Sequence, residues 1–299
     1  MFKLLKRYRF AILLLLVVGV LCLGYAYFIE PERLVVREVR VPLRGWNPAF
    51  NNFRIVALSD VHGGSNGGSE ANIRRIVETV NRQNADAVVI LGDFVSEEFF
   101  DRKQLKMPVR TIAEALGGLR AKHGVFAVLG NHDAAYSDEI VAGELRRAGL
   151  TVLVNEVAVI KSGDQQFRFF GMEDHIHTGN WGEFAQKMKN SLAATEGQGD
   201  LIALEHGPDL FPVLTDYILM SKDLRLMISG HTHGGQVWLP IIKAPIIPSI
   251  YGQKYAYGQV RAKDADLYVT SGTGTSLLPF RFGVPPEIAV LELVREEAE

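Results

Sequence analysis

The sequence has very little cysteine and no basic tract. Its single cysteine, Cys22, cannot form an intrachain disulfide, so the fold does not depend on disulfide bonds and the redox compartment is left open. The 32 lysine and arginine residues are balanced by 34 aspartate and glutamate residues. Because nucleic-acid-binding domains usually carry a basic patch or stripe, this balance argues against a nucleic-acid partner.

The sequence also lacks internal repeats and low-complexity tracts. Hydrophobic residues make up 47% and charged residues 22% of the chain, which is typical of a globular protein. We therefore predict one domain over residues 52–295, preceded by a linker or first strand at 29–51 and followed by a short tail at 296–299. The composition does not indicate an oligomeric state.

One long apolar run stands near the N-terminus. Residues 10–28 contain no charged side chain and are just long enough to cross the hydrocarbon core of a bilayer. We predict a single transmembrane anchor at 10–28 after a basic cytoplasmic segment at 1–9. The alternative is a cleaved signal peptide, but Gly24-Tyr25-Ala26 makes a poor cleavage site.

Basic residues flank this run on both sides, so they orient it only weakly. The positive-inside rule places the N-terminus in the cytoplasm and the body of the protein on the opposite side. A cytoplasmic body stays open as the alternative. The basic residues before the run are Lys3, Lys6, Arg7 and Arg9, and those after it are Arg33, Arg37, Arg40 and Arg44.

The rest of the chain alternates short apolar runs with amphipathic stretches, which favours stacked α/β layers. Between residues 70 and 83, Ile73, Ile76, Val77 and Val80 recur at helical spacing, so one face of a helix should pack on a sheet. The second half is richer in strand-like runs. We predict an α/β (α+β) sandwich of two mixed sheets flanked by helices.

Residues of metal-binding type stand where five apolar runs end. In α/β folds, ligands usually bind at such strand ends. The motifs are Asp60-Val61-His62, Gly92-Asp93, Gly130-Asn131-His132-Asp133, the lone His206, and Gly230-His231-Thr232-His233-Gly234-Gly235.

These five motifs, in this order, resemble the signature of calcineurin-like metallophosphoesterases. The HTHGGQ motif, the later LYVTSGTGTSLLPFRF and the closing EIAVLEL are similar to the bacterial YkuE/YaeI-type branch, whose members often carry N-terminal membrane signals. The resemblance covers most of the chain. It implies a phosphoesterase in the bacterial inner (cell) membrane with a single membrane pass.

The resemblance also implies two divalent metal ions. One would be bound by Asp60, His62, Asp93 and His233, and the other by Asp93, Asn131, His206 and His231. Asp93 would offer one oxygen to each ion, and a hydroxide held between the ions would be the nucleophile. Mixed imidazole, carboxylate and amide ligands suit manganese, iron or zinc.

Further residues are expected around this centre. The resemblance implies that His132 donates a proton or hydrogen bond to the leaving oxygen, with Asp133 orienting it. Asp174 and His175 follow a strand end and are predicted to contact substrate, with loop scaffolding as the alternative. Arg281 is predicted to bind a second phosphate or a carboxylate, with backbone anchoring of a loop as its alternative.

Residues 238–251 are unusually apolar for a loop and contain three prolines, so they cannot form a regular central strand. Two interpretations stay open: a flap packed on the core, and a wall that faces lipid.

Three functions are compatible with these features. The first is hydrolysis of a phosphodiester or pyrophosphate in a lipid-linked substrate such as UDP-2,3-diacylglucosamine of lipid A biosynthesis. The second is an envelope or phospholipid phosphodiesterase. The third is a non-catalytic membrane-anchored scaffold, but the complete set of motifs argues against it. A nuclease is also possible for such a protein but is disfavoured, because the sequence has no basic stripe.

Overall fold

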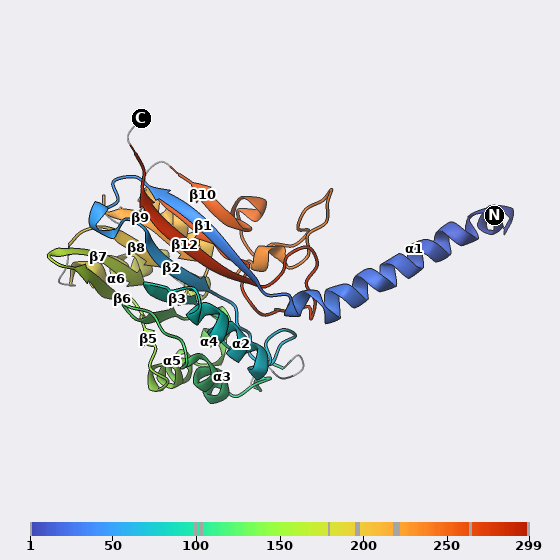
Figure 1. Ribbon diagram of the computed structural model, residues 1–299, viewed down its shortest axis with the longest axis horizontal. Coiled ribbons are helices and arrows are strands. Elements are labelled where there is room, and N and C mark those ends of the chain that lie inside the picture. Colours follow the sequence, from blue (N-terminus) through green and yellow to red (C-terminus); the bar gives the residue numbers. More distant parts are fainter. Residues whose placement is uncertain are drawn as a thin grey trace.

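The computed structural model describes residues 2–98, 101, 104–178, 180–194, 198–217, 222–262 and 265–297. Two six-stranded sheets stack face to face, with helices outside them (Figure 1). Both sheets contain parallel and antiparallel pairs. The predicted fold class of two mixed sheets flanked by helices is confirmed.

The first sheet has the order β1-β12-β2-β3-β4-β5. Strands β2 to β5 are mutually parallel, and β12 is antiparallel to β2. The bounds are β1 Val35–Leu43, β12 Glu287–Arg295, β2 Phe53–Leu58, β3 Ala87–Leu91, β4 Val125–Val128 and β5 Thr151–Val152.

The second sheet has the order β10-β11-β9-β8-β7-β6. Its central strands β7, β8, β9 and β11 are parallel, and the two edge strands are antiparallel to their neighbours. The bounds are β10 Gly258–Arg261, β11 Asp266–Val269, β9 Leu224–Ser229, β8 Leu201–Leu204, β7 Gln165–Gly171 and β6 Glu156–Ser162.

The main core lies between the sheets, where Trp46, Phe167 and Phe169 are fully buried. Three helices pack on the outer face of the first sheet: α2 (Glu70–Asn81), α3 (Val109–Leu116) and α5 (Asp138–Arg147). Helix α2 buries the four apolar residues predicted for its sheet-facing side. The second sheet is covered by α6 (Trp181–Ala193), through Phe184 and Met188.

The remaining helical segments are short. They are α4 Asn131–Tyr136, the 3₁₀ turns η1 Glu30–Glu32, η2 Pro48–Phe50, η3 His175–His177, η4 Pro208–Leu210, η6 His233–Gly235 and η7 Gly252–Tyr255, and the π turn η5 Val213–Tyr217.

Helix α1 (Phe2–Phe28) projects away from the two sheets (Figure 1). An 18-residue window within residues 8–32 has a mean hydropathy of 2.7, and this segment is long and apolar enough to cross a membrane. Among residues 8–28 of α1, whose side chains the structure describes, the inner end packs on the body, where Ala26 is buried and the rings of Tyr25 and Phe282 meet edge to face. The apolar side chains farther out are exposed, as expected for a helix whose solvent is lipid.

The segment after α1 is part of the sheet. Within residues 29–51, predicted as a linker or first strand, β1 pairs in parallel with β12 from Val35 opposite Glu287 to Leu43 opposite Arg295. Pro42 lies in this strand and is tolerated because β1 is at the edge of the sheet. A short, hydrogen-bonded connection therefore joins the apolar helix to the domain.

Candidate active site

Loops that follow five strands meet at one place between the two sheets. Strands β2, β3 and β4 of the first sheet, and β8 and β9 of the second, each end just before one of the sequence motifs. Parallel strands within a sheet present their carboxyl ends at the same edge, so the loops converge there. The seven predicted metal ligands are brought together by this arrangement.

Asp60, His62 and His233 form the first donor group. The two imidazoles face each other with their Nε2 atoms 3.2 Å apart, and Asp60 Oδ1 lies 3.3 Å from His233 Nε2. Asp60 Oδ1 is buried without a hydrogen-bond partner, whereas Oδ2 accepts hydrogen bonds from the Ser59 hydroxyl and the His231 backbone N–H. Buried lone pairs that converge in this way fit a cation.

The second donor group is centred on His206. Its Nε2 atom lies 3.1 Å from Asn131 Oδ1, 3.1 Å from His231 Nδ1 and 3.2 Å from Asp93 Oδ2. Four side chains of three chemical types therefore point at a common centre, which fits a second cation.

Asp93 joins the two groups through a single oxygen. Its Oδ2 faces both His206 Nε2 and His62 Nε2, the latter at 3.6 Å, while Oδ1 accepts the backbone N–H of His132 at 2.9 Å. The prediction that each oxygen serves one ion differs from this arrangement. Backbone hydrogen bonding occupies Oδ1, so only Oδ2 is free to face both groups.

Backbone carbonyl groups orient two of the imidazoles. The Nδ1 atoms of His62 and His206 contact the carbonyl oxygens of Val95 and Leu91, at 3.1 and 2.6 Å. With Nδ1 donating to a carbonyl, the Nε2 lone pair is left for a metal.

The charge of the site also favours cations. Burial lowers the pKa of His62 to about 4, so this imidazole is neutral at pH 7. Burial alone would lower the pKa of His206, but Asp93 raises it well above its ordinary value. A positive charge between His206 and Asp93 is therefore stabilising, whether a proton or a metal ion carries it.

The donor loops hold strained backbone conformations. Five predicted ligands have positive φ angles: Asp60 at 53°, His62 at 44°, Asp93 at 56°, His231 at 69° and His233 at 50°. Such angles cost free energy in residues other than glycine, and they concentrate at functional sites. At Gly130 a Cβ atom would lie 2.3 Å from Asp93 Oδ1, so only glycine lets these loops approach.

His132 lies at the edge of this centre and has a partner that the sequence motifs did not reveal. Its Nδ1 is 2.5 Å from Glu97 Oε2, and its Nε2 is 3.5 Å from the Ser276 hydroxyl. Burial alone would lower the pKa of His132, but the hydrogen bond that its Nδ1 donates to Glu97 and the charges of Asp93 and Glu97 raise it to about 9. Glu97 stands beside Glu98 in a loop, so the sequence offered no signal for choosing it.

The prediction that Asp133 orients His132 is therefore corrected. Asp133 is fully buried, and its carboxylate accepts four backbone N–H groups. These belong to Asp93, Phe94, Val95 and Gly130, at 2.9 to 3.2 Å. Asp133 fixes the loops that carry Asp93 and Asn131, and Glu97 is the residue that holds the His132 ring.

Asp174 and His175 do not line an open substrate surface, contrary to the prediction. Their side chains are 3% and 8% exposed, and His175 Nδ1 lies 2.7 Å from Glu205 Oε1. Glu205 directly precedes His206. The alternative of loop scaffolding describes the observed contacts, because the pair supports the second donor group from behind.

Arg281 is fully buried, which also differs from a substrate-binding role. Its guanidinium Nη2 lies 3.3 Å from His233 Nδ1, and burial lowers its pKa to about 10. It donates hydrogen bonds to the backbone carbonyls of Ser271, Gly272, Gly274 and Val284. Backbone anchoring of the terminal loop, the alternative for this residue, is what the structure shows.

Replacement of Arg281 by methionine should therefore mainly destabilise the protein. Each of the four buried carbonyls left without a donor costs about 1–3 kcal/mol, so we expect the thermal midpoint to fall by roughly 10 °C or more. Thermal unfolding of the detergent-solubilised chain measures this, with the exposed Arg110→Met as control. An unchanged midpoint together with a raised KM would instead indicate that Arg281 binds the substrate.

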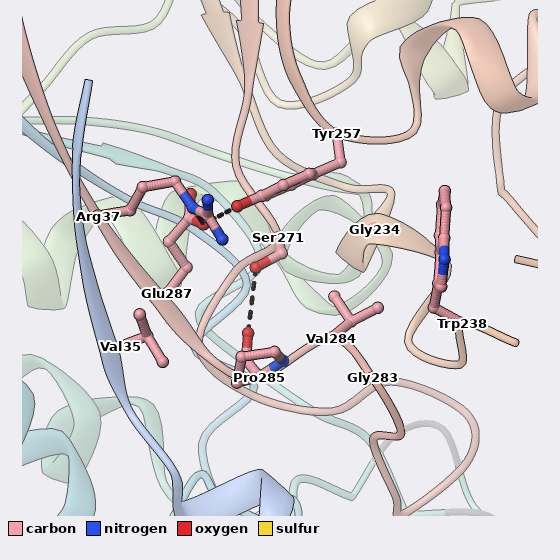
Figure 2. Close-up of a pocket in the computed structure, with 10 residues that line it drawn as sticks. All are labelled: Val35, Arg37, Gly234, Trp238, Tyr257, Ser271, Gly283, Val284, Pro285 and Glu287. Atoms are coloured by element: carbon pink, nitrogen blue, oxygen red, sulfur yellow. Dashed lines mark hydrogen bonds and ion pairs between the residues drawn. The ribbon is translucent and has the colours of Figure 1, made fainter. Parts of the chain in front are cut away.

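A cavity of about 240 Å³ is lined in part by Gly234, the residue after His233 (Figure 2). Trp238, Val284 and Pro285 form apolar parts of its wall. The Glu287 carboxylate in the cavity is already paired, because it accepts from Arg37 Nε at 3.1 Å and from the hydroxyls of Tyr257 and Tyr268. No predicted metal ligand is among its lining residues, so the donor groups and the cavity are separate features.

Comparison with known proteins agrees with this geometry. The family model of calcineurin-like phosphoesterases matches residues 53–235. The chain is 29% identical to metallophosphoesterase YkuE of Bacillus subtilis (strain 168), over 90% of this chain and 89% of that protein. It is also 29% identical to phosphodiesterase YaeI of Escherichia coli (strain K12), over 91% and 92%.

A third relative is the Danio rerio transmembrane protein with metallophosphoesterase domain, which is 28% identical over 96% of this chain and 63% of its own length. That relative is named as a transmembrane protein, and the apolar helix α1 of this chain is long enough to cross a membrane. The family model covers more than half of the chain, and the two donor groups supply the ligands that a dinuclear centre requires. The chain therefore belongs to the calcineurin-like phosphoesterase family and is a hydrolase of phosphoester bonds that uses two divalent metal ions.

Proposed function

We propose that this metallophosphoesterase hydrolyses a phosphodiester or pyrophosphate bond in a lipid-linked substrate, such as UDP-2,3-diacylglucosamine. The observation that carries the hydrolytic part is the position of Asp93 Oδ2 between two donor groups, with His132 beside them. The lipid-linked part is supported by α1, whose inner end packs against the segment that follows Ser276.

Each donor group is assigned one metal ion in this proposal. Asp60, His62 and His233 would hold the first ion, and Asn131, His206 and His231 the second, with Asp93 shared. When bound, two such ions activate a water molecule and neutralise charge on the phosphoryl group. The mixed nitrogen and oxygen donors suit manganese, iron or zinc.

The protein residues contribute proton transfer and positioning. The raised pKa of His132 keeps its imidazole protonated at neutral pH, so Nε2 can donate a proton to the leaving oxygen. Glu97 accepts from Nδ1 and thereby fixes the ring with Nε2 turned toward Ser276. Asp133 holds the loops of Asp93 and Asn131 through its backbone hydrogen bonds, which preserves the spacing of the donor groups.

The membrane side is part of the proposal. We infer a single pass through the bacterial inner membrane, with the domain outside the cytoplasm as the flanking basic residues favour. UDP-sugars are cytoplasmic, so an extracytoplasmic domain would favour a phospholipid or envelope phosphodiester instead.

Assays of the full chain in detergent micelles with added manganese test the substrate. UDP-2,3-diacylglucosamine, a diacyl phospholipid and bis-p-nitrophenyl phosphate would be compared. UMP release would support the nucleotide-linked lipid and require a cytoplasmic domain. Phospholipid cleavage without UMP release would assign the second substrate class. Cleavage of neither lipid, with turnover of the soluble diester, would contradict the lipid-linked substrate, and metal binding without any turnover would indicate a scaffold.

A further inference from the structure

Two loops expose large apolar side chains beside the active site. We call residues 238–251 and 276–280 together the apolar rim. Five isoleucines and leucines of the rim are among the most exposed large hydrophobic side chains that the structure describes: Ile241 is 93% exposed, Leu277 88%, Ile250 84%, Ile246 69% and Ile242 60%. Monomeric soluble proteins rarely expose so many large apolar side chains together, so a partner for this surface is expected.

The rim is a defined structure and not a collapsed flap. The Ser249 hydroxyl and the Ile250 backbone N–H both donate to the Asp209 carboxylate, at 2.5 and 2.9 Å. Leu239 and Lys243 pair through their backbones, and Ala244 is buried. The interpretation of residues 238–251 as a flap packed on the core does not fit four of their isoleucines, because the backbone is held while the side chains of Ile241, Ile242, Ile246 and Ile250 are exposed.

The rim is continuous with the inner end of α1. The Asn66 side-chain amide donates to the carbonyls of both Tyr27 and Pro279 at 2.7 Å, and the Arg281 N–H donates to the Ala26 carbonyl at 3.0 Å. Figure 1 shows the loops between β9 and β10 on the side of the molecule from which α1 extends. If α1 spans a bilayer, the rim cannot be far from the surface of that bilayer.

The two parts of the rim are also tied to each other and to a donor loop. Gln236, three residues after His233, accepts from the Ser276 N–H and donates to the Leu278 carbonyl. The Trp238 N–H donates to the Phe282 carbonyl at 2.7 Å. Through these bonds the two loops and the α1 end form one surface.

The charge of the rim fits a lipid surface. Residues 238–256 and 276–283 contain no aspartate or glutamate. Lys243 and Lys254 are exposed there. Where apolar side chains insert into a membrane, neighbouring lysines bind the anionic lipid headgroups. Tyr27 and Phe28, at the end of α1, are exposed aromatics of the kind found at membrane interfaces.

We propose that the apolar rim inserts into the interfacial region of the bilayer that α1 crosses, so that the active site opens at the lipid headgroups. Leu277 adjoins Ser276, whose hydroxyl is 3.5 Å from His132 Nε2, so insertion of the rim brings the proton donor to headgroup depth. The placement deepens the proposed function, because a lipid-linked phosphodiester would then reach the site without leaving its leaflet. The insertion itself requires α1 in the membrane and does not require hydrolysis.

A fluorescent probe tests the insertion without reference to activity. Cys22 is the only cysteine and lies in α1, so labelling it with an environment-sensitive fluorophore provides the positive control. In a Cys22→Ser background, Ile241→Cys, Ile250→Cys and Leu277→Cys carry the same label, and Ile140→Cys on α5 is the matched exposed control. Full chains are reconstituted in liposomes of phosphatidylethanolamine and phosphatidylglycerol.

We expect several-fold quenching of the three rim labels by lipid-attached quenchers, as for Cys22, and none for residue 140. Rim labels that stay unquenched while Cys22 is quenched would overturn the insertion. A blue shift in the fluorescence emission of the rim labels without quenching would also overturn the insertion. It would indicate that the rim binds a second copy of the chain or another protein. An unquenched Cys22 would remove the membrane-spanning helix on which the proposal rests.

A second variant connects the rim to catalysis. Ile241→Ser, Ile246→Ser and Ile250→Ser combined should lower hydrolysis of the vesicle-embedded lipid substrate by at least tenfold, while hydrolysis of soluble bis-p-nitrophenyl phosphate is unchanged. Equal loss with both substrates would indicate damage to the fold and contradict this role. If no lipid is hydrolysed at all, the proposed substrate class fails, and the quenching result still decides the insertion.

Discussion

Replacement of Asp93 by asparagine is expected to lower kcat by about 10³-fold or more and to reduce the bound metal from two ions to at most one. Asp93 Oδ2 faces both donor groups and lies 3.2 Å from His206 Nε2 and 3.6 Å from His62 Nε2. An amide oxygen keeps the shape but loses the negative charge that two cations share. Metal ions contribute several kcal/mol of transition-state stabilisation, and each 1.36 kcal/mol corresponds to a tenfold rate.

Initial rates with bis-p-nitrophenyl phosphate and metal content by elemental analysis measure the two effects of Asp93→Asn. Asp164→Asn, in the exposed turn between β6 and β7, is the matched control and should leave both unchanged. A variant that retains two ions and more than a tenth of the rate would show that Asp93 does not bridge.

Replacement of His132 by glutamine should slow hydrolysis by an amount that depends on the leaving group. General acid catalysis contributes about 10²- to 10⁴-fold, and we expect a loss of this size for a diester with an alkoxide leaving group. A p-nitrophenolate leaves without protonation, so the loss there should be less than about tenfold. Rates for the two diesters, with His123→Gln as control, check this.

The partner of His132 gives the same hypothesis a pH test. His132 must be protonated to donate, so the rate should fall as the pH rises through its pKa. Glu97 raises that pKa, and Glu97→Gln should therefore move the alkaline limb of the pH–rate profile to lower pH. Equal losses for both leaving groups in His132→Gln, or an alkaline limb that does not move in Glu97→Gln, would contradict proton donation by His132.

The residue types of the site and the class of the fold could be predicted from the order of amino acids alone. Each motif follows directly on an apolar strand, and the alternation of strands and helices implies that the strands run parallel with their ends at one edge. Convergence of Asp60, Asp93 and His206 therefore follows from local patterns and topology. The apolar run that forms α1 is likewise a local property, because twenty apolar residues suffice to define it.

The partners of the remaining polar residues could be identified only from the folded chain. Glu97 reaches His132 from a different loop, 35 positions away in sequence, and no periodicity relates the two. Asp133 and Arg281 look like catalytic or binding residues in the sequence, yet the side chains of both form hydrogen bonds with buried backbone groups. A charged side chain can serve either purpose, and burial is what separates them.

The exposure of residues 238–251 likewise could be determined only from the fold. The sequence of residues 238–251 is equally compatible with a buried flap and a lipid-facing loop, since both are apolar. The structure distinguishes them because Asp209 and the Phe282 carbonyl hold the backbone from outside the loop, at Ile250 and Trp238, while the side chains of Ile241 and Ile250 are exposed. Apolar content is a property of the chain, but the side on which it is displayed is set by contacts between segments that are distant in sequence.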